Sequence, residues 1–242
     1  MSGPGAPLAD SPPVALVHGW GGSFADTWQR SGFTALLDDA GRRVIGIDLL
    51  GHGTAPKPHD PHAYSALPDH VLAHLPDEPV DAVGFSMGAM TLLRVALAHP
   101  HRFHRLVLAG IGRNVFERDD AARQRIIAAI EGGAASSDRG DDTDNQARLF
   151  AQYAAQRGND PIALVAAMQA PPAPPLSDHD LQAITCPVLV AVGEHDFVLP
   201  ADRLVAALPD AKLVILKRSD HFATPEAFAF WDAVLDFLGA QT

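Results

Sequence analysis

The sequence predicts a single α/β domain, in which helices cover both faces of a mostly parallel sheet. Short runs of β-branched and apolar residues alternate with helical patterns along most of the chain, which is typical of parallel sheets. The chain has 242 residues, 47% hydrophobic and 19% charged, enough for one sizeable core. A stretch of about 80 residues near the middle has no strand pattern, which indicates an inserted subdomain or lid rather than a loop.

Each element follows from its local pattern. The apolar runs predict six strands, at Val14–Val17, Val44–Ile47, Ala82–Phe85, Arg105–Leu108, Val188–Val192 and Lys212–Leu216. The helical patterns outside the central stretch predict helices at Phe33–Ala40, Ala63–Leu75, Met87–Ala98, Asp202–Leu208 and Pro225–Leu238. The last helix has a start signal, with Thr224 as N-cap, Pro225 at the first position and Glu226 in the first turn.

The central stretch predicts a helical lid at about Ile111–Thr185. Its helical pieces are Asp120–Ile130, Gln146–Arg157 and Pro161–Gln169. They surround a polar, glycine- and aspartate-rich segment, Gly132–Asp144. The stretch returns to the sheet through Pro171-Pro172-Ala173-Pro174-Pro175, which predicts a stiff extended connector.

Composition excludes several classes of protein. The formal net charge is -11 and the basic residues form no cluster longer than a pair, which argues against nucleic acid and anionic membranes as partners. A single cysteine, Cys186, excludes an internal disulfide framework and a multi-cysteine metal site. Met1–Pro13 has no basic region or apolar stretch, and no run approaches a membrane span of about 18 apolar residues. We therefore expect a soluble cytoplasmic protein, whose oligomeric state the sequence leaves unknown.

The most informative motif is Gly84-Phe85-Ser86-Met87-Gly88, between a predicted strand and a predicted helix. A serine hydroxyl is a poor nucleophile at neutral pH, so it must be exposed and placed beside a base. A sharp strand-to-helix turn exposes Ser86, and small residues two positions either side let the backbones pack closely. The pattern alone is weak, but it gains weight from the strand before it and the helix after it.

A base and a group to orient it are expected beyond the last two strands. His221, in Ser219-Asp220-His221-Phe222, lies between the last strand and the last helix, and we predict that it is the base. Asp196, in Gly193-Glu194-His195-Asp196, follows the strand before and can accept the histidine Nδ1–H. Glu194 is the rival orienter, and Asp220 a weaker one.

Backbone N–H groups of Met87 and Trp20 are the predicted oxyanion donors. Met87 opens the helix that follows the serine. Trp20 lies in His18-Gly19-Trp20-Gly21-Gly22, directly after the first strand, where glycines allow a close approach to the nucleophile. A simple glycine-rich turn is the alternative interpretation.

With these motifs in order, the chain resembles the α/β-hydrolase family. The resemblance rests on the His-Gly-x-Gly-Gly loop, on Asp48-Leu49-Leu50-Gly51-His52-Gly53 after the second strand, and on the serine turn, Asp196 and His221. It covers about residues 14–240 and implies acyl transfer to Ser86 and hydrolysis by water, with a small-molecule substrate and neither a metal nor an organic cofactor. It departs from the pattern at the start, where about 13 residues are too few for the usual antiparallel hairpin, so we expect about six strands. Relatives with an aspartate nucleophile form an alkyl-ester intermediate that Ser86 could not make.

Two other site types fit less well. A dinucleotide site could use Gly19-Trp20-Gly21 and Asp48, but Phe24 stands at the third glycine position and Trp20 would crowd the pyrophosphate. A metal site could use the histidine groups, but none has His-Glu-x-x-His spacing. These groups are His59 with His62, and His99 with His101 and His104.

The sequence predicts the catalytic residues more precisely than it predicts the substrate and the reaction. We expect a carboxylesterase-like enzyme that cleaves a small, apolar ester-type substrate. The alternatives are C–C bond, lactone or thioester hydrolysis, cofactor-free oxygen chemistry, and a ligand receptor or signalling protein built on the same fold. The expected substrate-binding residues, for which core packing is the competing role, are Phe116, Phe150, Tyr153, Met168, Phe197 and Phe222.

Overall fold

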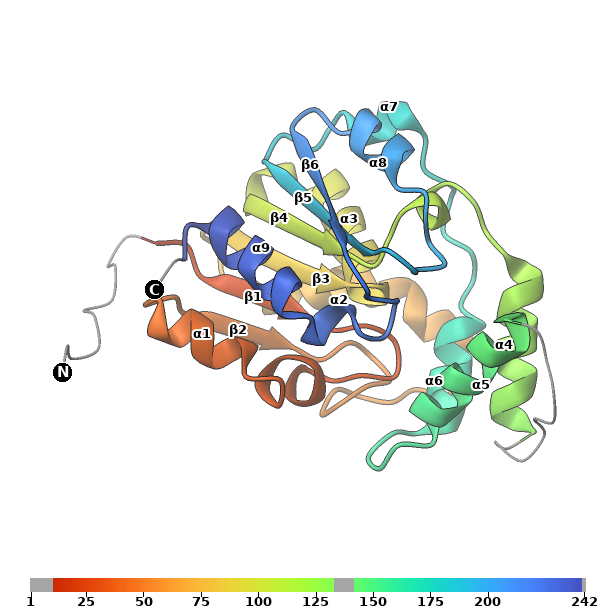
Figure 1. Ribbon diagram of the computed structural model, residues 1–242. Helices are drawn as coiled ribbons and strands as arrows, with labels where there is room; N and C mark the ends of the chain where they lie inside the picture. The colour runs from red at the N-terminus through yellow and green to blue at the C-terminus, as the bar shows by residue number, and fades with distance from the viewer. Residues whose placement is uncertain (1–10, 133–141, 241–242) are drawn as a thin grey trace.

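A six-stranded parallel sheet forms the centre of the protein (Figure 1), in a computed structural model that describes residues 11–132 and 142–240. The strand order is β2-β1-β3-β4-β5-β6, and every neighbouring pair is parallel. The strands are β1 Val14–Val17, β2 Val44–Ile47, β3 Val80–Phe85, β4 Phe103–Ala109, β5 Val188–Gly193 and β6 Ala211–Leu216. The expected sheet is confirmed.

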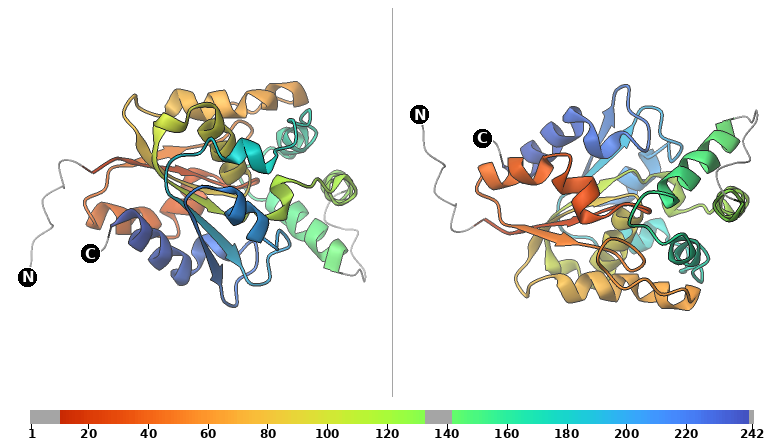
Figure 2. Two further views of the ribbon diagram at one scale, coloured as in Figure 1. Left: turned by 90° about the horizontal axis from the view of Figure 1, so that it is seen from above. Right: turned by 90° about the horizontal axis from the view of Figure 1, so that it is seen from below.

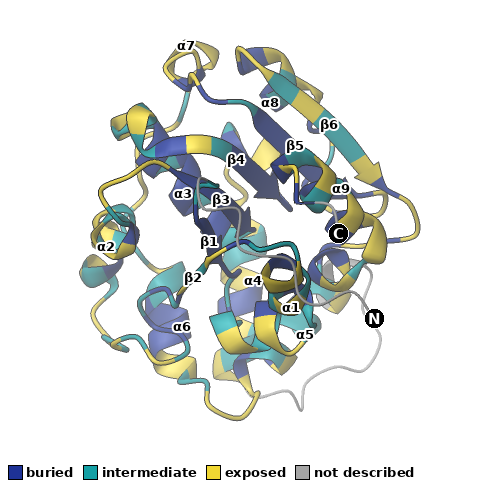
Figure 3. Cartoon of the chain, turned by 90° about the vertical axis from the view of Figure 1, so that its left-hand side faces the viewer, coloured by how far each residue is buried: buried dark blue, intermediate teal, exposed yellow. Residues whose placement is uncertain are grey.

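Helices cover both faces of the sheet and make two cores (Figure 2). The helices that flank the sheet are α1 Phe33–Asp39, α2 Leu67–His74, α3 Met87–Ala98, α7 Asp178–Leu181, α8 Asp202–Ala207 and α9 Phe228–Leu238. Alternate residues of β1 belong to opposite cores: Ala15 and Val17 belong to the core that also includes residues of α2, α3 and α8, whereas Val14 and Leu16 belong to the core that includes residues of α1 and α9. The strands are therefore largely buried, and exposed residues gather on the outer helix surfaces and on the edge strand β6 (Figure 3).

Five short segments of the described chain are wound as 3-10 or π turns. The segments are η1 Ala25–Gln29, η2 Pro61–Ala66, η3 Pro100–Arg102, η4 Arg113–Val115 and η5 Thr224–Glu226. Two of them, η2 and η5, lie where the sequence predicted parts of longer helices. The single helix predicted over Ala63–Leu75 is η2 followed by α2. Pro68 lies in the first turn of α2, where its missing N–H leaves no bond unmade.

The predicted start of the last helix is wrong. Thr224 does not cap it, because its hydroxyl donates to Asp220 O at 2.8 Å. The chain passes through extended Ala227 (φ -72, ψ 122), and α9 begins at Phe228. Trp231 Nε1 donates to Pro225 O at 2.7 Å and holds the preceding turn against the helix.

Between β4 and β5 the chain forms three longer helices beside the strand ends (Figure 1). They are α4 Asp120–Glu131, α5 Asp142–Ala154 and α6 Pro161–Met168. The connector at residues 171–175 has neither helix nor strand, as predicted. Most of the polar segment Gly132–Asp144, and most of Met1–Pro13, lie outside the described residues. The role of residues 111–185 as a lid stays a prediction.

The helices of the described part are short, and none of them is long and apolar enough to cross a membrane.

Candidate active site

Ser86 lies on the sharp turn that joins β3 to α3. Its backbone has φ 52 and ψ -112, a strained conformation for a non-glycine residue. A Cβ on Gly84 would lie 2.7 Å from Ala89 Cα, and one on Gly88 would lie 2.5 Å from Val17 O and His18 O. Both positions need glycine, because strand, helix and neighbouring loop meet there without room for side chains.

His221 and Asp196 complete a hydrogen-bonded chain with Ser86. His221 Nε2 lies 3.0 Å from Ser86 Oγ, and His221 Nδ1 lies 2.9 Å and 3.0 Å from the two carboxylate oxygens of Asp196. Both His221 and Asp196 are buried. Because a carboxylate only accepts, Nδ1 carries the proton and Nε2 is free to accept the serine proton.

The two rival carboxylates are used elsewhere. Glu194 Oε2 accepts from Arg218 N–H at 3.0 Å, and Asp220 Oδ1 accepts from Ala223 N–H at 2.9 Å. Each therefore stabilises its own loop, and of the three carboxylates Asp196 is the one bonded to His221.

Two glycines bring these loops together: Gly193, which opens the turn quoted for Asp196, and Gly110, which the sequence analysis did not single out. A Cβ on Gly193 would lie 2.6 Å from Ser219 O, so the loop that carries Asp196 packs directly on the loop that carries His221. Gly110, at φ 65, lies beneath the imidazole, and its Cβ would be 3.2 Å from His221 Cε1. Their signal in the sequence is their place directly at or after a strand end.

The glycine loop after β1 lies against the nucleophile. A Cβ on Gly19 would be 3.3 Å from Ser86 Cβ. Within the described ranges, the N–H groups of Trp20 and Met87 donate to no other backbone group. Two free donors on segments that flank Ser86 are what an oxyanion hole requires.

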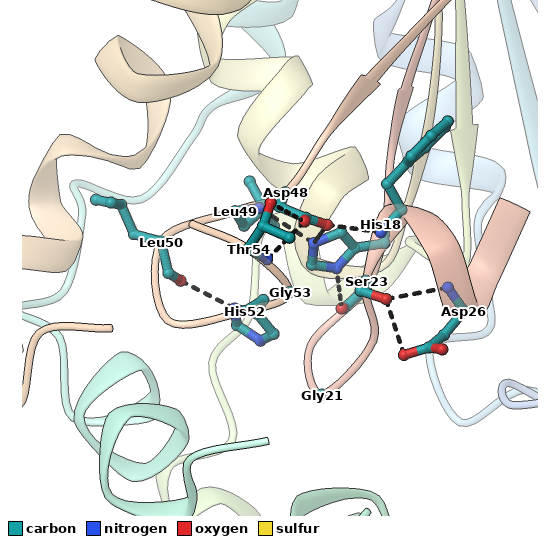
Figure 4. Close-up of polar contacts among 12 residues, drawn as sticks. His18, Gly21, Ser23, Asp26, Asp48, Leu49, Leu50, His52, Gly53 and Thr54 are labelled. Carbon is teal, nitrogen blue, oxygen red and sulfur yellow. Dashed lines mark hydrogen bonds and ion pairs between the residues drawn. The ribbon is translucent and has the colours of Figure 1, made fainter. Parts of the chain in front are cut away.

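A buried histidine, His18, connects the glycine loop after β1 to the segment after β2 (Figure 4). His18 Nδ1 lies 2.7 Å from Gly19 O, and Leu49 N–H donates to His18 Nε2 at 3.1 Å. The carbonyl only accepts and the amide only donates, so His18 is neutral with its proton on Nδ1. Burial lowers the pKa of His18 and keeps it neutral.

Asp48 and His52 form the rest of the same cluster (Figure 4). Asp48 accepts from the N–H groups of Phe24 at 2.7 Å and Thr54 at 2.8 Å. Burial works to raise the pKa of Asp48, but these hydrogen bonds outweigh it and hold the pKa below its usual value. With its two oxygens bound by Phe24, after β1, and by Thr54 in its own loop, Asp48 is not placed to hold a ribose. Burial lowers the pKa of His52 to about 3, because its ring is shielded from water.

A pocket of about 160 Å³, here called the Ser86 pocket, opens onto the nucleophile. Its inner wall is aromatic: the ring of Phe150 lies 5.3 Å from both Trp20 and Phe222, and Tyr153 stacks on Phe222 at 5.2 Å between centroids. Charged and polar side chains line the rest, namely Asp26, Arg30, Gln156 and Glu226. Sequence reasoning missed these four.

Three of the six expected substrate-binding residues line the Ser86 pocket: Phe150, Tyr153 and Phe222. Phe197 packs on the His221 ring at 4.4 Å between centroids, and with Met168 it lines a neighbouring cavity of about 630 Å³ under α4. Phe116 is not among the lining residues of the Ser86 pocket, because its ring packs against the core and under the Arg203 guanidinium at 3.9 Å, so its role in substrate binding stays a prediction.

The histidines considered as metal ligands have other surroundings. His59 Nε2 lies 2.9 Å from Asp160 Oδ2, and His104 Nδ1 lies 3.0 Å from Asp81 Oδ1, on different parts of the surface. His99 and His101 lie beside each other, with ring centroids 6.3 Å apart.

The fold has counterparts among known proteins. A family model described as the alpha/beta hydrolase family matches residues 14–229. The chain is 29% identical to a 2-hydroxy-6-oxo-2,4-heptadienoate hydrolase of Pseudomonas putida, covering 95% of this chain and 90% of that protein. It is also 29% identical to a pimeloyl-[acyl-carrier protein] methyl ester esterase of Neisseria meningitidis, with 95% and 80% covered. The crystal structure of a hydrolase from Pseudomonas aeruginosa PA01 superposes with a TM-score of 0.73 at 26% identity, covering 96% and 92%.

Proposed function

The chain belongs to the α/β-hydrolase family, and from that premise we propose that it is a serine hydrolase of small ester-type substrates. The observation that carries the proposal is the unbroken chain from Ser86 Oγ through His221 to Asp196, with contacts of 2.9 to 3.0 Å. The relatives include both a methyl ester esterase and a hydrolase of a 2-hydroxy-6-oxo-dienoate.

The proposed reaction has two halves. Ser86 Oγ attacks the carbonyl carbon while His221 Nε2 takes its proton, and the N–H groups of Trp20 and Met87 bind the resulting oxyanion. The intermediate collapses when His221 gives that proton to the departing alkoxide, leaving an acyl group on Ser86. Water then attacks the acyl carbon, His221 takes the water proton and returns it to Ser86, and the carboxylic acid leaves.

The size of the Ser86 pocket supports a small substrate. It encloses about 160 Å³, close to the cavity of ~150 Å³ that accepts one benzene molecule. One side of the scissile bond should therefore carry a group of about six heavy atoms. A neutral group is favoured, because the guanidinium of Arg30 in this pocket is already paired with Asp26.

C–C bond hydrolysis is the second candidate, and the Pseudomonas putida relative favours it. A dienoate substrate carries a carboxylate, and Arg30, which is already paired, is the one Lys or Arg among the described residues that line the Ser86 pocket. That pairing is why we place ester hydrolysis first. Lactone or thioester hydrolysis would use the same steps, whereas a ligand receptor would bind without turnover.

The test is turnover of p-nitrophenyl acetate, butyrate and octanoate by wild type, Ser86→Ala and the control Ser31→Ala. We expect Ser86→Ala to lose ~10⁴-fold or more of kcat and Ser31→Ala to lose nothing, because Ser31 lies outside the pocket lining. Butyrate should be turned over faster than octanoate. Comparable activity in Ser86→Ala would refute the proposal. Turnover of a 2-hydroxy-6-oxo-dienoate without turnover of any ester would favour the second candidate.

A further inference from the structure

A second pocket, of about 440 Å³, lies along the outer side of α3 and is here called the Arg94 pocket. Met87, Met90, Thr91 and Arg94 form one wall, at the i, i+3, i+4 and i+7 spacing that places residues on one helix face. The opposite walls come from residues 64–68 at the start of α2 and from residues 167–174, the end of α6 and the proline connector. Its lining has no residue in common with that of the Ser86 pocket.

The lining is mostly apolar and carries one charge. Leu67, Met87 and Met90 contribute apolar side chains, as do the prolines of the connector. Arg94 is the sole charged residue among the described residues of the lining, in a protein whose formal net charge is -11. A single cation in an apolar pocket is unexpected on a chain with an excess of acidic residues, and it needs a physical explanation.

The protein itself leaves most of the Arg94 charge uncompensated. One nitrogen, Nη2, donates to Pro174 O at 3.1 Å. This bond uses one of the five N–H groups of the guanidinium and leaves the other four to donate to a ligand. Within residues 11–132 and 142–240 no carboxylate forms an ion pair with it. Arg94 is half-buried, and burial lowers the pKa of its guanidinium, so the charge is held at a cost in free energy.

We propose that the Arg94 pocket binds a carboxylate that carries a short apolar chain. The guanidinium presents paired donors that match the two oxygens of a carboxylate. The hydroxyl of Thr91 donates its proton to Met87 O at 2.8 Å, so only its acceptor side is free and it does not compete for an anion. The contact with the Arg94 guanidinium would therefore be the one strong anion contact in the pocket. The apolar chain would lie along Met90 and Met87, toward the amino end of α3. This site does not rest on the proposed esterase activity.

The methionines of this chain give the proposal a direct readout. There are four, Met1, Met87, Met90 and Met168. Met87 and Met90 line the Arg94 pocket, whereas Met168 lines the cavity under α4. We would label the methionine methyl groups with ¹³C, assign them with Met→Leu variants, and titrate the Ser86→Ala protein with hexanoate and with uncharged hexanamide.

Hexanoate should shift the Met87 and Met90 signals in a saturable way and leave Met168 unmoved, and hexanamide should bind at least ~10-fold more weakly. Arg94→Gln should raise the Kd for hexanoate by at least ~10-fold, and Arg94→Lys by less, because lysine keeps the charge without the fork. The matched control Arg30→Gln, at the Ser86 pocket, should leave the Kd unchanged. An unshifted Met168 signal in unliganded Arg94→Gln would establish that the variant is folded.

Three outcomes would overturn the site: no saturable shift of Met87 or Met90, an unchanged Kd in Arg94→Gln, or a Kd that depends on Arg30 instead. The last would assign the anion to the Ser86 pocket. Because the readout is binding to a protein without its nucleophile, failure here leaves the esterase proposal intact, and failure of the esterase proposal leaves this site intact.

Discussion

Replacing His18 with leucine should slow catalysis without touching any group proposed to contact the substrate. His18 Nδ1–H donates to Gly19 O at 2.7 Å, and Gly19 O belongs to the same peptide unit as Trp20 N–H. In a planar trans peptide the C=O and N–H point in opposite directions. Holding the carbonyl toward His18 therefore holds the Trp20 N–H on the other side, where the loop approaches Ser86.

The size of the effect follows from what remains after the substitution. Losing one oxyanion donor outright costs ~10²–10³ in kcat. In His18→Leu the Gly22 N–H still donates to Gly19 O at 3.2 Å, so the donor would be misaligned rather than lost, and we expect a fall of ~10–100-fold. KM should change little, because the oxyanion exists only in the transition state and intermediate. The unpaired Leu49 N–H should also cost about 1–3 kcal/mol of unfolding free energy.

The assay is kcat and KM for p-nitrophenyl butyrate, with urea unfolding alongside, and His52→Leu is the matched control. His52 is equally buried and lies 5.2 Å from His18 between ring centroids. Its Nδ1–H donates to Leu50 O, away from the Gly19 peptide. His52→Leu should therefore keep kcat close to the wild-type value. An unchanged kcat in His18→Leu, or an equal loss in both variants, would refute the reasoning.

Two further predictions concern the orienting carboxylate and the response to acid. Asp196→Asn should lower kcat by ~10³–10⁴-fold through the wrong His221 tautomer, and Glu194→Gln should stay near wild type; the reverse order in the ester assay would identify Glu194 as the orienter. Because the folded-state pKa of His52 is about 3, against 6.5 for an ordinary histidine, the unfolded chain takes up this proton as pH falls below about 6.5 and the folded protein does not. Unfolding free energy should therefore drop by about 2 kcal/mol from this residue between pH 7 and pH 5. Urea titrations of wild type and His52→Leu at both pH values check this, and equal slopes with pH would contradict it.

Sequence order was enough to place the three catalytic candidates. Parallel strands end at one edge of the sheet, so residues that directly follow β3, β5 and β6 meet there. Ser86, Asp196 and His221 each follow one of those strands, and their contacts agree with that placement. The order β2-β1-β3 also brings the loop after β1 beside Ser86, which is why Trp20 could be named as a donor.

Local signals failed where a side chain had a stronger partner elsewhere in the fold. Thr224 has every mark of an N-cap, yet its hydroxyl donates back to Asp220 O and the helix starts later. By contrast, the side chains of Ser177 and Asp180 form a capping box that starts the short helix α7, a helix that the sequence analysis did not predict. Local propensity decides such ends only when no tertiary bond competes for the same atoms.

The sequence indicated only part of the pocket walls, namely Phe150, Tyr153 and Phe222 of the Ser86 pocket. The rest could not be predicted, because each pocket is assembled from segments far apart in the chain. The spacing of Met87, Met90 and Arg94 predicts a shared helix face, but periodicity does not say what that face meets. The connector around Pro174 arrives about 80 residues later and encloses Arg94, the one charged side chain among the described residues that line this apolar pocket. Phe116 shows the converse, because an aromatic residue in the stretch expected to form the lid meets Arg203 instead of the Ser86 pocket. The shape of both pockets therefore depends on how the inserted helices and their connector return to the sheet, and that return is set by long-range packing rather than by any motif.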